Sequence, residues 1–241
     1  MNIAIIGYGK MGKIIEQIAQ KKGHSIGLII DVDNTHELNA KNLKQIDCAI
    51  EFTTPQAAVN NFLICFENNI PIVSGTTGWT QQLELVKRKC LENNGSFFHA
   101  SNFSLGVNIF FKINNYLAQI MHYFDDYNVA IEETHHIHKL DKPSGTAITL
   151  ANQILKHYPQ KKQWSLPPAS NNELEITAHR KGNIVGIHTI TYQSQIDKIT
   201  ISHEAFSRQG FANGAIIAAE FLKGKKGIYS MNDLLESFNI N

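Results

Sequence analysis

Residues 3–12 read Ile3-Ala4-Ile5-Ile6-Gly7-Tyr8-Gly9-Lys10-Met11-Gly12, an apolar run that leads into three glycines. A helical pattern follows to about Lys22, so the glycines stand between a strand and a helix, as the G-x-G-x-x-G fingerprint requires. Gly7 is expected to make the tight turn, Gly9 to let a pyrophosphate approach the backbone, and Gly12 to let helix and strand pack closely. The phosphates would lie at the helix N-terminus, where free N–H groups favour an anion. The stretch predicts cofactor contacts at Gly7, Tyr8, Gly9, Lys10, Met11 and Gly12.

An acidic residue follows at the spacing expected for a group that binds the adenosine ribose. Asp31 stands nineteen positions beyond Gly12, at the end of the second apolar run. Asp33 is the competing candidate for this role. The glycines alone would indicate only an ordinary glycine-rich turn. With the strand, the helix and the acid in place, they predict that the chain binds a dinucleotide.

Short apolar runs alternate with helix-patterned stretches over the first hundred residues, which is typical of βαβ units around a parallel sheet. Strands are expected near 2–6, 25–30, 47–52, 70–74 and 96–100. Two turns after these strands would lie at the carboxyl edge of the sheet, where α/β folds bind ligands: Phe52–Pro55 and Gly75–Gly78. Both offer hydroxyls, and the second adds backbone amides for the nicotinamide ribose or carboxamide. Each alone would be a plain turn.

From Tyr127 the pattern changes to β-rich segments, expected at 129–134, 174–180, 184–192 and 198–203. This change predicts a second, α+β domain with an open mixed or antiparallel sheet. Ile187 alternates out of phase with His188, Ile190 and Tyr192, so both faces of this sheet are expected to be covered, one of them by a subunit contact. From Arg208 to Phe238 the pattern is helical again and rich in small residues, which suits close packing.

The composition excludes several classes of protein. Among 241 residues, 22 Lys and Arg stand against 21 Asp and Glu, so neither nucleic acid nor an acidic membrane is expected as a partner. No run of about 18 apolar residues predicts a transmembrane helix, and the first strand follows Met1 too closely for a signal peptide. Cys48, Cys65 and Cys90 form no C-x-x-C pair. Their number and spacing suggest neither disulfides nor a zinc knuckle, and a reducing cytoplasm fits best.

Most of the chemistry is concentrated in residues 132–147, which read Glu-Glu-Thr-His-His-Ile-His-Lys-Leu-Asp-Lys-Pro-Ser-Gly-Thr-Ala. Three histidines and a lysine within residues 135–139 would line a pocket that attracts an anion. Ser144 or Thr146 can cap the helix expected over 147–157, with the amides of Gly145 and Thr146 facing outward to receive a carboxylate. Imidazoles exchange protons near neutral pH, and a lysine among other cations can act as a general acid.

Two other interpretations of the histidines compete with this one. A metal site would need further ligands, but the cluster has no cysteine partner and the residues that follow favour anions, so no metal is expected. The histidines could instead be strand residues whose nitrogens bond neighbouring carbonyls. Their clustering with Lys139 and with the Ser-Gly-Thr turn disfavours that interpretation.

At this point the sequence resembles the 4-hydroxy-tetrahydrodipicolinate (dihydrodipicolinate) reductases. The stretch from Glu133 to Ala147 is similar to that family's signature, E-x-H-H-x-x-K-x-D-x-P-S-G-T-A. The similarity continues in residues 75–78, 100–108 and 208–215, so it spans the whole chain. It implies an NAD(P)H-dependent reductase of lysine and diaminopimelate biosynthesis that acts on a small dicarboxylate.

The resemblance also assigns roles to residues. It implies that His135 and Lys139 are the acid–base pair and that the substrate dicarboxylate is bound by His136, Ser144, Gly145 and Thr146. Cofactor contacts would come from 7–12 and from Asp31, Gly75, Thr76, Thr77, Ala100, Ser101, Asn102 and Phe103. Val32 follows Asp31 where members that hold a 2′-phosphate tend to carry arginine, so NADH is expected to be used at least as well as NADPH.

The architecture implied is a Rossmann-type domain over 1–104, a substrate-binding and oligomerisation domain over 105–207, and a helical segment over 208–241 that returns to the first domain. Hinges would lie at 102–104 and 208–211, and the assembly would be a homotetramer built through the substrate-domain sheets. Two rival functions remain: another two-domain dehydrogenase, such as one acting on aspartate, and a non-catalytic nicotinamide sensor. The first would lack the run from Lys139 to Thr146, and the second has no need of His135 and Lys139.

Overall fold

A computed structural model describes residues 1–238, and the chain divides into two compact units. Unit 1 comprises residues 1–105 together with the chain from residue 209 onward, and unit 2 comprises residues 106–208. The chain therefore passes between the units twice. Both crossings lie one residue from the boundaries expected from the sequence.

Unit 1 is built on a six-stranded sheet in which every pair of neighbours is parallel. The order is β11-β5-β4-β3-β1-β2, and the strands are β1 (Asn2–Ile6), β2 (Ser25–Ile30), β3 (Cys48–Glu51), β4 (Ile72–Ser74), β5 (Ser96–His99) and β11 (Gly227–Tyr229). The five strands predicted for this region are confirmed. The expectation of continuous helix from 208 to 238 is wrong, because β11 adds an edge strand beside β5.

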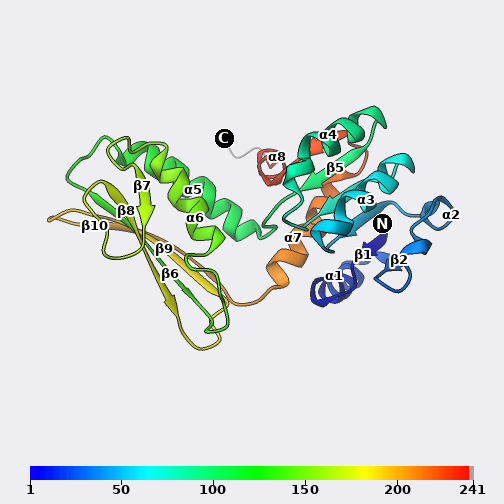
Figure 1. Ribbon diagram of the computed structural model, residues 1–241, viewed down its shortest axis with the longest axis horizontal. Coiled ribbons are helices and arrows are strands. Elements are labelled where there is room, and N and C mark those ends of the chain that lie inside the picture. Colours follow the sequence, from blue (N-terminus) through cyan, green and yellow to red (C-terminus); the bar gives the residue numbers. More distant parts are fainter. Residues whose placement is uncertain (239–241) are drawn as a thin grey trace. The chain divides into compact units, whose positions relative to one another are not determined.

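Helices cover both faces of this sheet (Figure 1). One face packs against α1 (Lys10–Lys21), α7 (Gln209–Leu222) and α8 (Met231–Glu236); the other packs against α2 (Ala40–Leu43), α3 (Pro55–Glu67) and α4 (Leu83–Glu92). Short 3-10 turns occur at η1 (Thr35–Glu37) and η2 (Thr80–Gln82). A Cβ on Gly214 of α7 would lie 1.8 Å from the carbonyl oxygen of Phe103. The small residues of the returning helix therefore permit close backbone contact.

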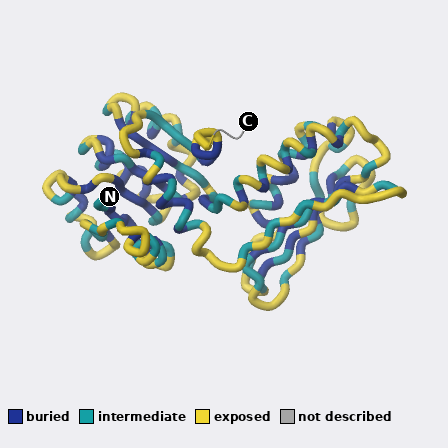
Figure 2. The backbone as a smooth tube through the Cα atoms, turned by 180° about the vertical axis from the view of Figure 1, so that it is seen from behind, coloured by how far each residue is buried: buried dark blue, intermediate teal, exposed yellow. Residues whose placement is uncertain are grey.

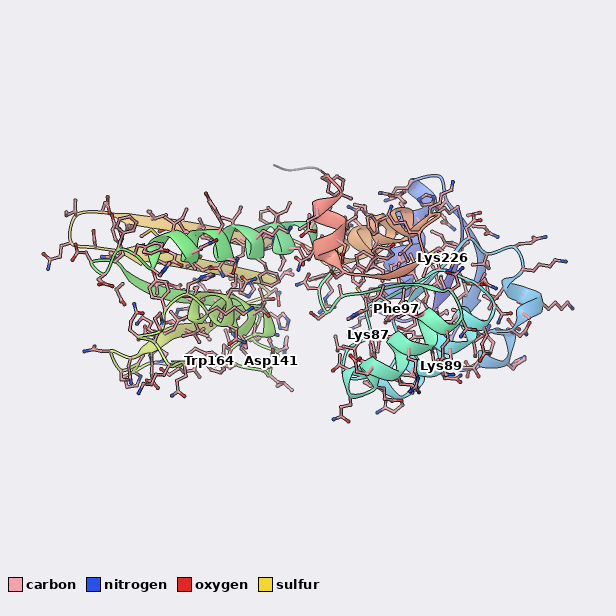
Figure 3. All side chains as sticks on the ribbon, turned by 90° about the horizontal axis from the view of Figure 1, so that it is seen from above. Lys87, Lys89, Phe97, Asp141, Trp164 and Lys226 are labelled. Carbon is pink, nitrogen blue, oxygen red and sulfur yellow. The ribbon has the colours of Figure 1, made fainter. Side chains whose placement is uncertain are left out.

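The buried strands of unit 1 appear as the dark core of Figure 2. Phe97 of β5, labelled in Figure 3, is fully buried. Its ring centroid lies 5.0 Å from that of Phe62 and 5.7 Å from that of Phe66, both on α3. Such aromatic contacts fix the helix on the sheet, so the carboxyl ends of the strands have a rigid support.

Unit 2 packs two helices on one face of a mixed five-stranded sheet. Its elements are α5 (Leu105–Met121), β6 (Asn128–His135), α6 (Gly145–Leu155), β7 (Gln163–Ser165), β8 (Glu173–Arg180), β9 (Gly186–Gln193) and β10 (Lys198–Ala205), with strand order β10-β9-β6-β8-β7. The open mixed sheet is confirmed, and β7 was not predicted. The expectation that both faces are covered does not hold within one chain, since α5 and α6 lie on the same face.

Over residues 1–238, no helix is both long and apolar enough to span a bilayer.

Candidate active site

The carboxyl edge of the unit 1 sheet carries a cleft of about 470 Å³. Three turns, after β1, β3 and β4, contribute its lining residues: Gly9, Lys10, Met11, Phe52, Thr53, Pro55, Gly75, Thr76 and Thr77. Six of these are among the cofactor contacts predicted from the sequence. Because open α/β sheets bind ligands at this edge, the cleft is the candidate cofactor site.

The three glycines of the first turn have different surroundings. Gly7 has φ +94°, and a Cβ there would lie 2.1 Å from the carbonyl oxygen of Phe52. A Cβ on Gly12 would lie 2.3 Å from the Gly7 oxygen, whereas one on Gly9 would meet no atom within 4 Å. Packing therefore requires Gly7 and Gly12, while the space above Gly9 is open at the start of α1. Gly9 provides no side-chain cap for that helix, so the first turn of α1 fits an anionic group.

Besides Gly7 and Gly12, the predicted cofactor residues that lie outside the lining of this cleft are Tyr8, Asp31, Ala100, Ser101, Asn102 and Phe103. The Tyr8 hydroxyl donates to Glu16. Asp31 is exposed immediately after β2, and its backbone N–H donates to Asn34 Oδ1 at 2.7 Å. Phe103 is 2% exposed and belongs to the core beneath α7, so its side chain supports the unit from within.

In unit 2, the sheet face that packs on the helices changes from apolar to polar along its strands. The inward residues of β6 are, in order, Val129, Ile131, Glu133 and His135. Glu133 is paired with Ala178 of β8 and His188 of β9, and His135 is paired with Arg180. One end of the core face therefore gathers a carboxylate, two imidazoles and a guanidinium.

Glu133 is the centre of this polar cluster, and its side chain is fully buried. Its Oε1 accepts hydrogen bonds from Arg180 Nη1 at 3.1 Å, from Arg180 Nη2 at 3.2 Å and from the backbone N–H of Ser144 at 3.1 Å. His135 Nδ1 lies 2.5 Å from Oε2. A single carboxylate thus links β6, β8 and the start of α6.

The cluster has defined charges at neutral pH. Burial alone would raise the pKa of Glu133, but its contacts with His135, Ser144 and Arg180 outweigh burial and lower that pKa to about 2. Burial, and then the nearby His135, lower the pKa of His188 to about 4. Glu133 is therefore an anion paired with Arg180, and His188 is neutral.

The imidazole of His135 is held on two sides. Nδ1 faces Glu133, and a Cβ on Gly186 would lie 2.9 Å from Nε2. The His188 ring meets it edge-on, with centroids 5.0 Å apart. With Nδ1 in contact with the carboxylate, Nε2 is the nitrogen left for proton exchange.

The start of α6 lies beside this cluster. Ser144 is the N-cap, and its hydroxyl accepts from the Ala147 N–H at 3.2 Å and bonds His188 Nε2 at 3.0 Å. Ser144 is only 2% exposed, so its hydroxyl supports the helix start. Within residues 1–238, the N–H groups of Gly145 and Thr146 make no hydrogen bond, and Gly145 is exposed. Two amides at a helix N-terminus can receive a carboxylate.

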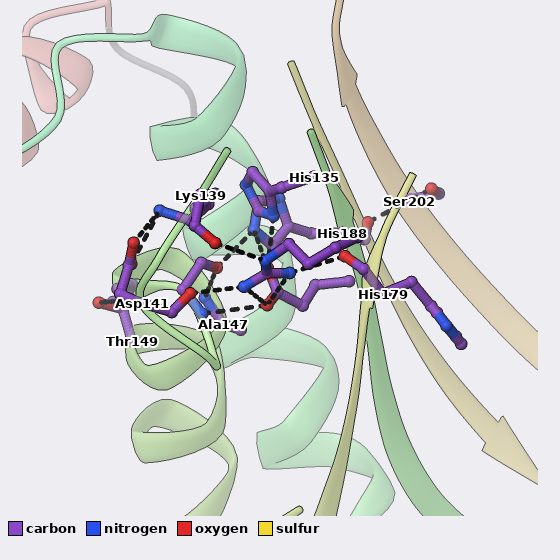
Figure 4. A network of polar contacts seen from close by, with 12 residues as sticks. His135, Lys139, Asp141, Ala147, Thr149, His179, His188 and Ser202 are labelled. Atoms are coloured by element: carbon purple, nitrogen blue, oxygen red, sulfur yellow. Dashed lines mark hydrogen bonds and ion pairs between the residues drawn. The ribbon is translucent and has the colours of Figure 1, made fainter. Parts of the chain in front are cut away.

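The other predicted residues lie on the loop between β6 and α6. Lys139 Nζ lies 2.8 Å from each carboxylate oxygen of Asp141. Figure 4 draws this ion pair. His136 is half-buried. Burial, followed by the nearby His138 and Arg208, lowers the pKa of His136. The backbone carbonyls of Lys139 and Asp141 accept from Arg180 at 3.2 and 2.5 Å, so the same guanidinium that neutralises Glu133 also shapes this loop.

Glu133, His135 and His188 also bring three potential metal-ligand atoms within 4.8 Å of one another. Arg180 already binds Glu133, and Ser144 already binds His188 Nε2. The Arg180 guanidinium lies 3.1 Å from Glu133 Oε1, and its charge would repel a divalent cation bound there. The bonds of Glu133 and His188 would also have to break before these side chains could bind a metal. The geometry fits an ion-pair network better than a metal site.

Sequence reasoning did not assign roles to Glu133, Arg180 or His188. The alternation of side chains along each strand could have indicated these residues. Ile131, Ile176 and Ile190 point to the core. The polar residues stand at even spacings from them, so they point to the same side of the sheet. The pairing of β6 with β8 and β9 brings the three side chains together, and this pairing belongs to the tertiary structure.

Comparison with known proteins gives a consistent picture. Two family profiles cover nearly all of the chain: the N-terminal region of dihydrodipicolinate reductase matches residues 1–103, and its C-terminal region matches residues 106–235. The chain belongs to the dihydrodipicolinate reductase family. A 4-hydroxy-tetrahydrodipicolinate reductase of Christiangramia forsetii is 51% identical over 236 residues, 98% of each chain. One of Methanocaldococcus jannaschii is 35% identical over 231 residues, 89% of this chain and 83% of that protein.

Solved structures agree with the family. A dipicolinate-bound dihydrodipicolinate reductase from Paenisporosarcina superposes with a TM-score of 0.79 at 25% identity, covering 97% of this chain and 99% of the other. An amine dehydrogenase from Mycobacterium smegmatis reaches 0.57 at 10% identity, covering 95% and 94%, which shows a shared fold alone. The predictions of family, fold class and reductase activity are confirmed, and the family depends on a pyridine nucleotide.

Proposed function

We propose that this chain reduces 4-hydroxy-tetrahydrodipicolinate, as its dehydrated cyclic imine, to tetrahydrodipicolinate with NADH or NADPH, in lysine and diaminopimelate biosynthesis. The observation that carries the proposal lies in unit 2. There, His135, fixed by a buried carboxylate, stands at the same end of the fold as the unbonded amides of Gly145 and Thr146. A proton donor beside a carboxylate receptor suits a dicarboxylate substrate.

The substrate carboxylates would bind to the N–H groups of Gly145 and Thr146, with His136 and Lys139 adding donors and positive charge. Ser144 contributes by capping α6, which presents these amides. The amides point outward before a ligand arrives, so little reorganisation is needed on binding.

Reduction requires a hydride and a proton to enter the ring. When bound, the reduced nicotinamide supplies the hydride. His135 and Lys139 are the residues proposed to supply the proton. Glu133 holds the His135 ring so that Nε2 can exchange protons, and Lys139 lies on the loop that follows β6. The hinges expected at 102–104 and 208–211 remain predictions.

The cleft in unit 1 is proposed to hold the dinucleotide. Its pyrophosphate would lie over Gly9 at the start of α1, where an added Cβ would meet no atom within 4 Å. The backbone amides of Thr76 and Thr77 would face the nicotinamide ribose or carboxamide, since the Gly75 amide already donates to the Glu51 carbonyl at 3.0 Å. Asp31 would bind the adenosine ribose from the end of β2.

The test is an assay of nicotinamide oxidation. The purified chain is mixed with NADH and the freshly made product of the preceding synthase, and absorbance at the nicotinamide band is followed; dipicolinate should inhibit. Aspartate with NAD⁺, and oxaloacetate with ammonium and NADH, are the control reactions for the rival dehydrogenase function. Turnover of either control, or binding of NADH without any turnover, would refute the proposed reaction in favour of one of the two rivals.

We also propose that the enzyme is a cytoplasmic homotetramer. The three cysteines are free and buried, which suits a reducing compartment. On α5, the exposed residues Ile109, Ile113, Tyr116 and Ile120 recur at helical spacing on one flank. An apolar stripe of this kind, together with the uncovered face of the unit 2 sheet, supports subunit contacts. Light scattering of the purified chain gives the number of subunits directly.

A further inference from the structure

Unit 1 contains a buried carboxylate to which sequence reasoning gave no role. Glu51 ends β3 and is 0% exposed. Its Oε1 accepts from the Thr53 N–H at 3.0 Å, from the Thr53 hydroxyl, and from the Thr76 hydroxyl at 2.8 Å. Its Oε2 accepts from the Ser74 hydroxyl at 2.6 Å. Every partner of this carboxylate is thus a neutral donor.

Two of these partners, Thr53 and Thr76, lie on two of the three turns that line the candidate cofactor cleft. Thr53 follows β3 and Thr76 follows β4, and both line the cleft. The Thr53 N–H also donates to the Thr76 hydroxyl at 2.8 Å, so the two turns are joined directly as well as through Glu51. Both threonine hydroxyls face the carboxylate. In this structure the two hydroxyls therefore hold the turns together.

The third turn packs against the same assembly. A Cβ on Gly7 would lie 2.1 Å from the oxygen of Phe52 and 2.9 Å from Thr53 Cγ2. A Cβ on Gly75 would lie 2.1 Å from the Phe52 ring. The glycine turn, the turn after β3 and the turn after β4 therefore interlock around residues 51–53.

We propose that Glu51 is a positioning residue that joins the turns after β3 and β4 and thereby sets the shape of the dinucleotide cleft. It touches neither substrate nor reacting atoms. Without the Glu51 carboxylate, the turns that carry Thr53 and Thr76 could move apart. The backbone amides of the cleft would then no longer be held in the arrangement that binds the dinucleotide. This inference rests on the proposed binding of a dinucleotide at the cleft.

Three variants separate positioning from general support of the fold. Thr76→Val removes the Thr76 hydroxyl at almost constant volume, and with it both its bond to Glu51 and the direct bond from the Thr53 N–H. Glu51→Ala removes every bond made by the carboxylate and leaves the direct bond from the Thr53 N–H to the Thr76 hydroxyl. Glu51→Gln can keep the network, because its amide oxygen can accept from the threonines while its NH₂ donates to Ser74 Oγ, a hydroxyl able to accept.

Ser96→Ala is the matched control. Ser96 is buried in the same sheet, and its hydroxyl donates to the Lys225 oxygen at 2.5 Å. It begins β5, so it lies at the amino edge of the sheet, away from the cleft. Its loss should lower the melting temperature without changing cofactor affinity.

The measurements are the Kd of NADH by fluorescence titration, KM and kcat, and the melting temperature of each variant. Thr76→Val and Glu51→Ala should weaken NADH binding by roughly tenfold or more, with a smaller change in kcat, and Glu51→Gln should restore binding to within about threefold. If Glu51→Ala does not fold, Thr76→Val and Glu51→Gln decide. Folded Thr76→Val with a Kd within twofold of wild type overturns the proposal, as does equal weakening in Ser96→Ala. A wild type that binds no NADH would instead overturn the proposed function.

Discussion

The two units each bury one glutamate beneath a functional edge, and they stabilise it in opposite ways. Among residues 1–238, Glu51 in unit 1 has only hydroxyl and amide donors as partners, and burial raises its pKa despite them. Glu133 in unit 2 is bound by Arg180 and contacts His135, and its pKa falls to about 2. The difference matches the proposed tasks. Unit 1 arranges backbone for an anionic cofactor, whereas unit 2 holds fixed charges beside a group that exchanges protons.

The largest expected effect tests this division of tasks. His135→Ala and Lys139→Ala should each lower kcat by ~10²–10⁴ while the Kd of NADH changes little, because the proton donors belong to unit 2 and the cofactor cleft to unit 1. Steady-state kinetics and fluorescence titration on the same preparations measure both quantities. Wild-type turnover in both variants would remove the acid–base assignment.

The second effect concerns stability and distinguishes the two glutamates directly. Glu133→Gln leaves the Arg180 guanidinium with carbonyl partners alone, and breaking such a buried pair costs about 3 kcal/mol of unfolding free energy at pH 7. Glu51→Gln should be close to neutral or stabilising at the same pH, because it replaces a carboxylate that burial disfavours. Urea unfolding of both variants and the wild type provides the comparison.

The pH dependence of that effect has a definite sign. The pKa of Glu133 is lower in the folded state, at about 2, than in the unfolded chain, where it is near 4.5. Its contribution is therefore fully present above pH 5 and lost as pH falls toward 2, and the difference between wild type and Glu133→Gln should shrink over that range. For Glu51 the folded pKa is raised, so its contribution is present at acid pH and lost as pH rises. A Glu133→Gln difference that is constant from pH 7 to pH 3 would contradict the charge assigned to Glu133.

How much of this the sequence predicts depends on whether a feature is local. The glycine turn, the five strands of unit 1 and the run from Glu133 to Ala147 are contiguous patterns, and their fold and family were predictable. β7 and β11 are three-residue strands. They form because they pair with the free edge of a neighbouring strand, β8 for β7 and β5 for β11. A pattern of three residues does not predict such pairing. Arg180 lies 47 positions from Glu133, so their contact depends on strand register.

The position of Ser144 likewise depends on contacts that are distant in the sequence. A serine before a helix predicts either a cap or a ligand contact, and the sequence leaves both open. Burial decides between them, because His188 from β9 covers the hydroxyl. The neighbouring Gly145, with no such cover, keeps the outward position that the pattern predicts.

A smaller effect is expected at the carboxylate receptor of unit 2. Thr146→Val removes a hydroxyl at the start of α6 but keeps the backbone amide, so KM for the substrate should rise by about three- to tenfold with kcat lowered less. The carboxylate is charged in both ground and transition states, so a donor to it acts on binding. The Kd of NADH serves as the internal control and should not move. An unchanged KM would mean that Thr146 contributes only to the helix start.

The smallest effect concerns the choice between NADH and NADPH, which tests unit 1 alone. Asp31 and Asp33 are exposed at the end of β2, and Val32 between them is 81% exposed. A carboxylate there can accept hydrogen bonds from the ribose hydroxyls of NADH and repels the 2′-phosphate of NADPH. Val32 offers no guanidinium to bind that phosphate. Lys10 and Lys13, near the glycine turn, are the only opposing charges that α1 places there. We therefore predict that kcat/KM with NADH is at least equal to that with NADPH, and that Val32→Arg shifts the ratio toward NADPH. A wild type that prefers NADPH tenfold, about 1.4 kcal/mol, would show that the lysines outweigh Asp31.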